Sequence, residues 1–372
     1  MTYVEAAAMN QPVLSQSSRA VEVADQSSVM LADLVLDRDD VEGVWDRGFE
    51  VCPQRIENYM TSPYGVGTIW AYRPEGRTIH GAIGLHAQKL SLGGKVHSVG
   101  QIGNLAVDMK YRSVGPAVRL QRALLASLDG SDRTLIFGIT SKAVHVLKRA
   151  GCKPVGTAQR WVKILRSETQ LKKRLRPPLF AKTAAPLVDI GLRMMSREMF
   201  PRRSAGVTVG MGLAFDSRFD RLWERVAAKF PIATQRTAEY LTWRFCGGSD
   251  SPYQVLWIAD ANKELLGYIV YEVRNRDVVE VADVLFDGTP ALDRLLIEFL
   301  RHIRASEDRI SAVSISWFGS TLLADRLKRF GFHSRPEDLQ TFVYGDSATL
   351  ADAEPQIFDT EQWYLTGSDV DL

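Results

Sequence analysis

The sequence predicts an α+β fold with a mixed α/β sheet, present twice in one chain of 372 residues. Between residues 31 and 166, periodic patterns follow in the order helix, three or more antiparallel strands, helix, strand, helix, strand. The same order returns between residues 206 and 345, and LKRAG at 147–151 matches LKRFG at 327–331. A match in both local sequence and element order indicates an internal repeat.

In the first copy, a polar lead over residues 1–30 precedes a helix from Asp39 or Asp40 toward Met60, which acidic residues open. Alternating runs predict three strands, and Gly93-Gly94 makes a hairpin turn between the last two. The expected elements are strands 66–72, 79–90 and 96–107, helix 117–128, strand 134–139, helix 142–149 and strand 159–165.

The second copy is expected to open with a helix over 216–229 and a hairpin whose turn is Asp260-Ala261-Asn262. Its later elements alternate strand and helix, as in the first copy. The expected elements are strands 253–259, 265–273 and 278–285, helix 292–305, strand 310–317, helix 321–330 and strand 341–344.

Residues 167–205 form a predicted linker, since eleven Lys and Arg face three acids between residues 163 and 203, among several prolines. It is either a solvated connection or an amphipathic element that contacts an anionic membrane surface or an acidic substrate. The last segment, 346–372, has seven acids and no Lys or Arg. It is expected either to cover a basic surface, anchored by Trp363 and Tyr364, or to be disordered.

The bulk composition narrows the function. A formal net charge of +2 argues against a dedicated nucleic-acid binder. The three cysteines lie far apart and show no metal-ligand spacing with the six histidines, so we expect no metal site and a reduced, cytoplasmic setting. The amino terminus does not resemble a signal peptide, and no segment approaches the roughly 20 apolar residues that span a bilayer.

One turn predicts a binding site for phosphate groups. The strand at 105–108 ends in a turn from Arg112 to Ala117, which opens directly into a helix. The unpaired N–H groups and positive dipole end of such a helix favour a pyrophosphate. Gly115 permits close approach of the backbone to the phosphates, and Arg112 adds positive charge.

The same residues carry a family resemblance. LAVDMKYRSVGPAVRLQRALL at 105–125 resembles motif A of the GCN5-related N-acetyltransferase (GNAT) superfamily, with its Arg/Gln-x-x-Gly-x-Gly/Ala pattern. GITSKAVHVLKRAGCKPVG at 138–156 resembles motif B, with Cys152 in the place of an aromatic residue. The two-copy layout, with YLTWRF at 240–245 opening the second copy, is similar to tandem GNAT proteins, often associated with cell-envelope amine acylation in bacteria.

The resemblance implies an acetyl-CoA or longer acyl-CoA co-substrate. The strand at 105–108 would pair with the pantetheine arm, and a strand N–H near Val107 would polarise the thioester carbonyl. The N–H groups of Val114, Gly115 and Ala117 would hold the pyrophosphate. The full set of implied cofactor residues is Leu105, Val107, Arg112, Val114, Gly115, Ala117 and Thr140.

Two positions depart from the family pattern. Gln101 stands where many GNAT enzymes carry a Glu that acts as the general base. Leu147 stands where many carry a Tyr that acts as the general acid. Catalysis would then rest on proximity or on other groups. The candidate catalytic residues are Asp108, His86 and Glu50, with His80 as a further histidine expected on the same strand face as His86.

The second copy lacks the phosphate-binding turn, because FDGTP at 286–290 replaces it and Asp287 would repel a phosphate. It is expected instead to line the acceptor pocket with Tyr240, Arg244 and Asp283. The expected function is transfer of an acyl group to a primary amine, either of an envelope amino sugar or of a sphingoid-type lipid. A non-catalytic CoA-binding regulator and a Fem-like aminoacyl-tRNA-dependent ligase are the alternatives.

Overall fold

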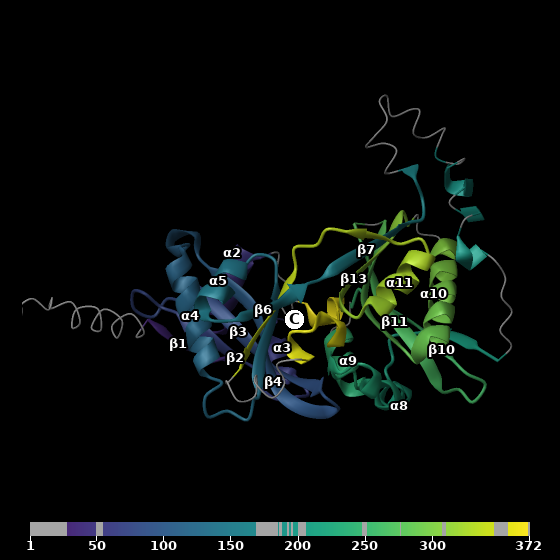
Figure 1. The fold of residues 1–372 in the computed structure, drawn as a ribbon. Coiled ribbons are helices and arrows are strands. Elements are labelled where there is room, and N and C mark those ends of the chain that lie inside the picture. The colour runs from purple at the N-terminus through teal and green to yellow at the C-terminus, as the bar shows by residue number, and fades with distance from the viewer. Residues whose placement is uncertain are drawn as a thin grey trace, which may run out of the picture.

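The computed structural model shows two α+β halves joined by one sheet (Figure 1). It describes residues 28–49, 55–168, 185, 188–191, 193–194, 196–199, 206–247, 251–275, 277–306, 310–345 and 356–370. The first 27 residues, most of the basic linker and part of the acidic tail therefore lie outside the described residues. The first half comprises residues 28–164, and the second half comprises residues 206–345.

The first half follows the predicted order closely. Its elements are β1 Val29–Leu31, α2 Arg38–Gly48, α3 Arg55–Thr61, β2 Thr68–Tyr72, β3 Gly81–Leu92, β4 Lys95–Val107, η1 Met109–Tyr111, α4 Val114–Ala126, β5 Leu135–Thr140, α5 Val144–Ala150, β6 Lys153–Thr157 and β7 Gln159–Ile164. The single helix expected toward Met60 is two helices, α2 and α3. Strand β6 was not predicted, and α4 begins three residues before the expected start at Ala117.

The second half repeats the alternation. Its elements are β8 Thr208–Met211, α8 Ser217–Val226, η3 Ala227–Lys229, β9 Ile232–Thr234, α9 Ala238–Phe245, β10 Gln254–Ala259, β11 Leu265–Arg274, β12 Val278–Phe286, α10 Gly288–Ala305, β13 Ala312–Gly319, α11 Thr321–Arg329, β14 His333–Arg335 and β15 Gln340–Gly345. A short η2, Arg197–Met199, precedes them. Helix α9 was not predicted, although Asp220 accepts the Ala238 N–H and the Thr237 side chain accepts the Tyr240 N–H at its start.

Helices cover both faces of the first-half sheet. Helices α2 and α3 contact β3, while α4 packs against β2 and β3 from the other face and against α5. The apolar side of α4 buries Leu120 and Leu124 in a cluster with Leu85 of β3. The four-residue spacing of these two leucines places both on the helix face that packs against the sheet.

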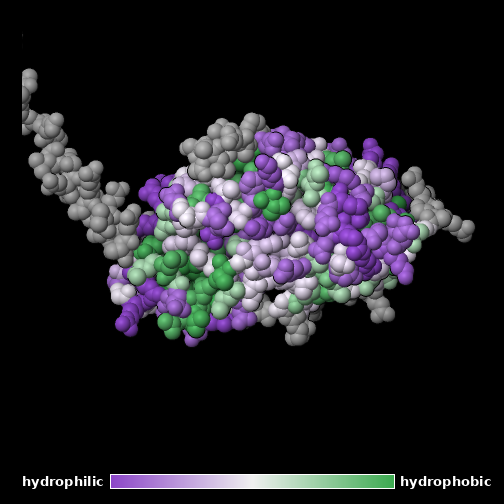
Figure 2. Space-filling model, turned by 90° about the horizontal axis from the view of Figure 1, so that it is seen from below, coloured by the Kyte–Doolittle hydropathy of each residue, from purple (hydrophilic) through white to green (hydrophobic). Residues whose placement is uncertain are grey.

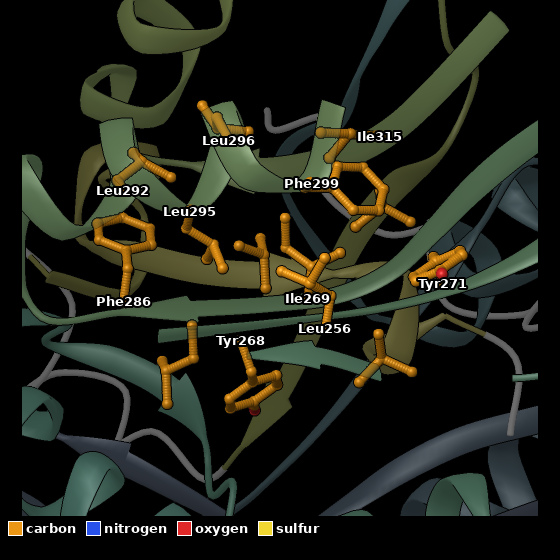
Figure 3. Close-up of a cluster of buried hydrophobic side chains, with 14 of the residues drawn as sticks. Leu256, Tyr268, Ile269, Tyr271, Phe286, Leu292, Leu295, Leu296, Phe299 and Ile315 are labelled. Atoms are coloured by element: carbon orange, nitrogen blue, oxygen red, sulfur yellow. The ribbon is translucent and has the colours of Figure 1, made fainter. Parts of the chain in front are cut away.

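The largest apolar cluster lies in the second half (Figure 3). Helix α10 lays one face on β11 and β12, and Leu292, Leu295 and Phe299 point toward Ile269 of β11. These side chains are fully buried. Each contributes about 1.5–3 kcal/mol through removal of apolar surface from water.

The two halves exchange their last strands. Strand β7 of the first half pairs with β13 of the second, and β15 of the second half inserts between β5 and β6 of the first. Periodicity identifies such strands but does not identify their partners, so the sequence gives no sign of the exchange. Within the described residues, all strands consequently join one mixed sheet.

Part of the acidic tail lies inside the molecule. Residues 363–366 form β16, which pairs with β13 and β9 in the middle of the sheet. Trp363 and Tyr364 are 1% and 0% exposed, so they anchor the segment in the interior and not on a basic surface. Figure 1 shows this end of the chain between the two halves.

The surface mixes polar and apolar residues, with apolar ones gathered over the first half in Figure 2. Exposed apolar side chains of that half are Met30, Leu31, Val35, Leu36, Met60, Val66, Val96 and Met109. Among the described helices, none combines the length and the apolar character that a membrane crossing needs.

Candidate active site

A wedge opens between β4 and β5. These parallel strands pair only from Val99–Leu135 to Gln101–Phe137, although β4 continues to Val107 and β5 to Thr140. The outer edges stay paired, β4 with β3 and β5 with β15. Residues 102–107 of β4 and 138–140 of β5 therefore border a gap in the hydrogen-bond ladder, here called the first wedge. Leu105, Val107 and Thr140 all lie along it.

A β-bulge shapes the β4 side of the first wedge. The register of β3 and β4 shifts between Ala82 and Gly84, opposite Asn104. Asn104 has a φ of +55° and is 5% exposed, and its side chain accepts a hydrogen bond from the Tyr59 hydroxyl at 3.3 Å. Asn adopts this left-handed conformation more readily than most residues. A bulge turns backbone groups out of the ladder, which is how strands re-aim groups beside active sites.

The bulge was not predicted from the sequence, although a signal was present. Gly103 and Asn104 interrupt the alternation of the strand, and a glycine inside a strand pattern often marks a bulge. The role of Tyr59 could not be foreseen, because it depends on the packing of α3 over β3. A side chain at Gly84 would overlap the Tyr59 ring, so the glycine makes room for it.

The start of α4 closes one end of the first wedge. Ser113 precedes the helix in an extended conformation and makes no side-chain cap, so the helix leaves its first N–H donors uncapped by that residue. Pro116 has no N–H, and the donors are those of Val114, Gly115 and Ala117. A Cβ added at Gly115 would meet atoms at 3.6 Å or more. Packing within the chain therefore does not demand this glycine.

Asp108 follows β4 at the same end of the wedge and has two cationic or polar partners. Its Oδ1 accepts from Arg47 Nε at 2.8 Å, and its Oδ2 lies 2.9 Å from His80 Nδ1. Partial burial would raise the pKa of the Asp108 carboxyl, but the hydrogen bonds from Arg47 and His80 outweigh it and hold the pKa below its usual value. The geometry favours a carboxylate that orients its neighbours.

The two strand histidines are not on one strand face. β3 begins at Gly81, and His80 lies before it, next to the Tyr111 ring at 4.6 Å between ring centres. His86 is 1% exposed and stacks on Tyr59 at 3.6 Å. Of the three catalytic candidates, His86 therefore lies beside the bulge and Asp108 near the start of α4, while Glu50 falls outside the described residues.

The second half contacts the first half through α9, which lies beside α3 and β3. The Tyr240 hydroxyl accepts from Gln88 Nε2 at 3.4 Å, and its ring stacks on Tyr64 at 5.5 Å. Trp243 Nε1 donates to Thr61 Oγ1 at 3.2 Å. Burial raises the pKa of Tyr64 to about 12 and that of Tyr240 further. Both phenols are therefore neutral hydrogen-bonding groups at physiological pH.

A buried ionic network fixes the C-terminal segment near the same place. Arg236 is fully buried; its Nε lies 3.1 Å from Asp283 Oδ1 and its Nη2 lies 2.8 Å from Asp369 Oδ2. Burial would lower the pKa of the Arg236 guanidinium, but the two carboxylates hold it well above its usual value. Arg244 Nε donates to the Ser368 carbonyl at 3.2 Å. Asp283 thus contacts structural partners, and Arg244 contacts the tail.

The second half has its own wedge, which the chain fills. Strands β12 and β13 pair from Val278–Ala312 to Val281–Ile315 and then part. β16 pairs with β13 beyond that point, and the Tyr364 hydroxyl donates to the Val284 carbonyl of β12. At the nearby start of α10, Asp287 is ion-paired with Arg225 and Lys229. Strand β16 therefore closes this wedge directly. From the sequence alone, the charge of Asp287 was expected to exclude a phosphate there.

A cavity of about 160 Å³ remains beside β16 and the first turn of α10. Its lining includes the aromatic side chains Phe230, Phe286, Trp317, Trp363 and Tyr364. Strand β16 thus leaves a small space at the start of α10, whereas in the described part of the chain no strand lies between β4 and β5.

Comparison with solved structures identifies the fold. The chain is similar to Saccharomyces cerevisiae N-myristoyltransferase with bound myristoyl-CoA, with 14% identity, a TM-score of 0.57, and coverage of 91% of this chain and 81% of that one. A GCN5-related N-acetyltransferase from Anabaena variabilis gives 14% identity, a TM-score of 0.61, and coverage of 87% and 75%. Eis1 from Mycobacterium abscessus gives 12% identity, a TM-score of 0.56, and coverage of 86% of this chain and 74% of that one.

A scan against protein-family models finds no match, and a comparison with curated sequences finds none either. The structural likeness extends over nearly the whole chain and includes both halves. The chain has the fold of the GCN5-related N-acetyltransferases.

Proposed function

We propose that the protein is an acyl-CoA-dependent N-acyltransferase with one cofactor site, in the first wedge. The observation that carries the proposal is the contrast between the wedges: the first ends at an uncapped helix start, and β16 fills the second. An extended thioester arm fits an unpaired strand edge, and a pyrophosphate fits free N–H donors at a helix N-terminus. The coverage of the structural neighbours supports the same proposal.

In this proposal, the cofactor supplies an activated acyl group, and the chain binds and orients it. Val114, Gly115 and Ala117 direct their N–H groups at the pyrophosphate, and Arg112, which is exposed, adds charge at the rim. Backbone amides near the bulge at Asn104 offer donors to a thioester oxygen. The acceptor amine enters from the side where α9 faces α3, past Tyr64 and Trp243, which are partly exposed.

For the acceptor, we propose a primary amine, carried by an envelope amino sugar or a sphingoid-type lipid. Tyr64, which follows α3, and Tyr240 and Trp243 of α9 supply apolar contact area, and the two buried phenols supply neutral polar groups. A peripheral membrane contact through the basic linker would suit a lipid acceptor.

The test of the cofactor site is a matched pair of charge insertions. Gly115 and Thr289 are each the second residue of a helix, α4 and α10. Gly115→Glu places a carboxylate where the pyrophosphate would lie, and we expect isothermal calorimetry to show at least a hundred-fold weaker CoA binding. Thr289→Glu places the same charge at the second helix start and should leave one CoA bound per chain with unchanged affinity.

Two outcomes would contradict the proposal. Equal losses in both variants would remove the distinction between the wedges, and no heat with CoA, acetyl-CoA or palmitoyl-CoA for the folded wild type would remove the cofactor. Turnover is followed as release of CoA thiol with a panel of primary amines that includes glucosamine, phenethylamine and sphinganine. Tight CoA binding without release of thiol would favour the non-catalytic regulator.

A further inference from the structure

Gln101 occupies the base of the first wedge. It is the last β4 residue that pairs with β5, and its partner on the neighbouring strand β3 is His86. The side chain is 2% exposed. A long polar side chain is seldom buried this deeply unless it makes hydrogen bonds.

The orientation of the Gln101 amide follows from its one contact. Nε2 lies 2.8 Å from the carbonyl oxygen of Asp369. A carbonyl oxygen can only accept a hydrogen bond, so the NH₂ end of the amide must face it. The opposite orientation would bring two oxygens together. The buried ionic network around Arg236 holds Asp369 in place, and the amide is thereby locked.

The other end of the same amide is left as an acceptor. Gln101 Oε1 is buried and has no hydrogen-bond partner among the described residues. A buried acceptor without a donor is unfavourable, and native proteins keep few of them. Gln101 is the residue at which β4 and β5 part, three residues before the bulge at Asn104 where the proposed thioester donors lie.

We propose that Gln101 is a positioning residue for the acceptor: its Oε1 accepts one N–H of a primary amine during attack on the thioester. The inference rests on the proposed function. An amide oxygen is not a base, so it can hold a hydrogen but cannot remove it. The hydrogen bonded to Gln101 must therefore be one that the nucleophile keeps.

The balance of the reaction selects the nucleophile. The amine nitrogen forms a C–N bond, the C–S bond breaks, and the leaving thiolate takes up a proton and departs as CoA thiol. A primary amine loses one of its hydrogens to solvent, and the product amide retains the other, still bonded to Gln101. A secondary amine or an alcohol has a single hydrogen, which must leave. Gln101 thus selects primary amines.

The experiment compares Gln101→Met with wild type, using the best primary amine of the panel and its N-methyl derivative. Wild type should acylate the primary amine at least ten-fold faster in kcat/KM. In Gln101→Met, kcat/KM for the primary amine should fall about ten-fold, the loss expected for one buried hydrogen bond, and the preference over the N-methyl amine should shrink. The KM for acyl-CoA should stay within two-fold.

The control is Ser314→Ala on β13, in the second half. Ser314 is buried, and its hydroxyl has no partner among the described residues, so the variant removes an orphaned polar atom away from the first wedge. Its amine kinetics should match wild type.

Two results would overturn the inference: a Gln101→Met variant with wild-type amine kinetics, or one that loses acyl-CoA and amine parameters equally. If the variant does not fold, the wild-type preference decides alone, and equal rates for both amines would refute the role. A wild type that binds no CoA or acylates no amine would instead refute the proposed function itself.

Discussion

At the scale of single residues, the site contains side chains that orient their protein neighbours and side chains that are placed to contact the substrate. Asp108 has the residue type of a general base, yet both its oxygens contact Arg47 and His80. Its lowered pKa makes it a poor proton acceptor near neutral pH. Gln101 has no basic character but presents a buried oxygen to the first wedge.

Asp108→Asn tests this division. We expect about 1 kcal/mol or more of lost stability, from a partly buried ion pair, with kcat within a few-fold of wild type. The pKa of Asp108 is depressed in the folded protein, so its charge stabilises the fold above about pH 4. As pH falls through the depressed pKa, this contribution disappears, and the unfolding curves of variant and wild type should converge. A hundred-fold loss of kcat at unchanged stability would instead make Asp108 the base.

Arg236 is the residue on which the C-terminal segment most depends. Arg236→Met leaves two buried carboxylates, Asp283 and Asp369, without their guanidinium partner. Removing one member of a buried ionic network costs about 3–5 kcal/mol, and urea denaturation should register it. Arg221→Met, which breaks an exposed pair with Glu264, is the control and should change stability far less. Similar losses of stability in the two variants would show that the buried network contributes no more to stability than an exposed ion pair.

At the scale of secondary-structure elements, sequence patterns located most of the longer helices and strands but not their partners. The predicted phosphate-binding turn lies at the start of α4, because a strand, a glycine-containing turn and a periodic helix follow one another locally. β7 and β15 were located at 159–165 and at 341–344, yet each pairs outside its own copy. β16 was not predicted as a strand, although Trp363 and Tyr364 were expected as anchors. Pairing depends on contacts between residues far apart in the chain, which a single sequence does not display.

The same limit applies to the site. The donors of α4 could be predicted, because a helix start presents them whatever surrounds it. The locked amide of Gln101 could not, because it depends on Asp369, which lies 268 positions away in the sequence. The acceptor residues expected from the second half likewise depend on packing: Tyr240 lies beside α3, while Asp283 belongs to the buried ionic network.

At the scale of the whole molecule, the exchanged strands should make unfolding a single event. β7 and β15 each depend on the opposite half for their ladder partners. We expect differential scanning calorimetry to give one transition with equal calorimetric and van't Hoff enthalpies. Two resolved transitions would show that each half is stable without the strand it borrows.

The exchange also limits how a substrate can reach the site. A clamshell opening of the two halves would break the ladders of β7 with β13, of β15 with β5 and of β3 with β9. An acceptor must therefore enter through movements of side chains and loops at the rim of the site, while the two halves keep their relative position. A covalent staple between the halves, placed away from the first wedge, should leave turnover intact.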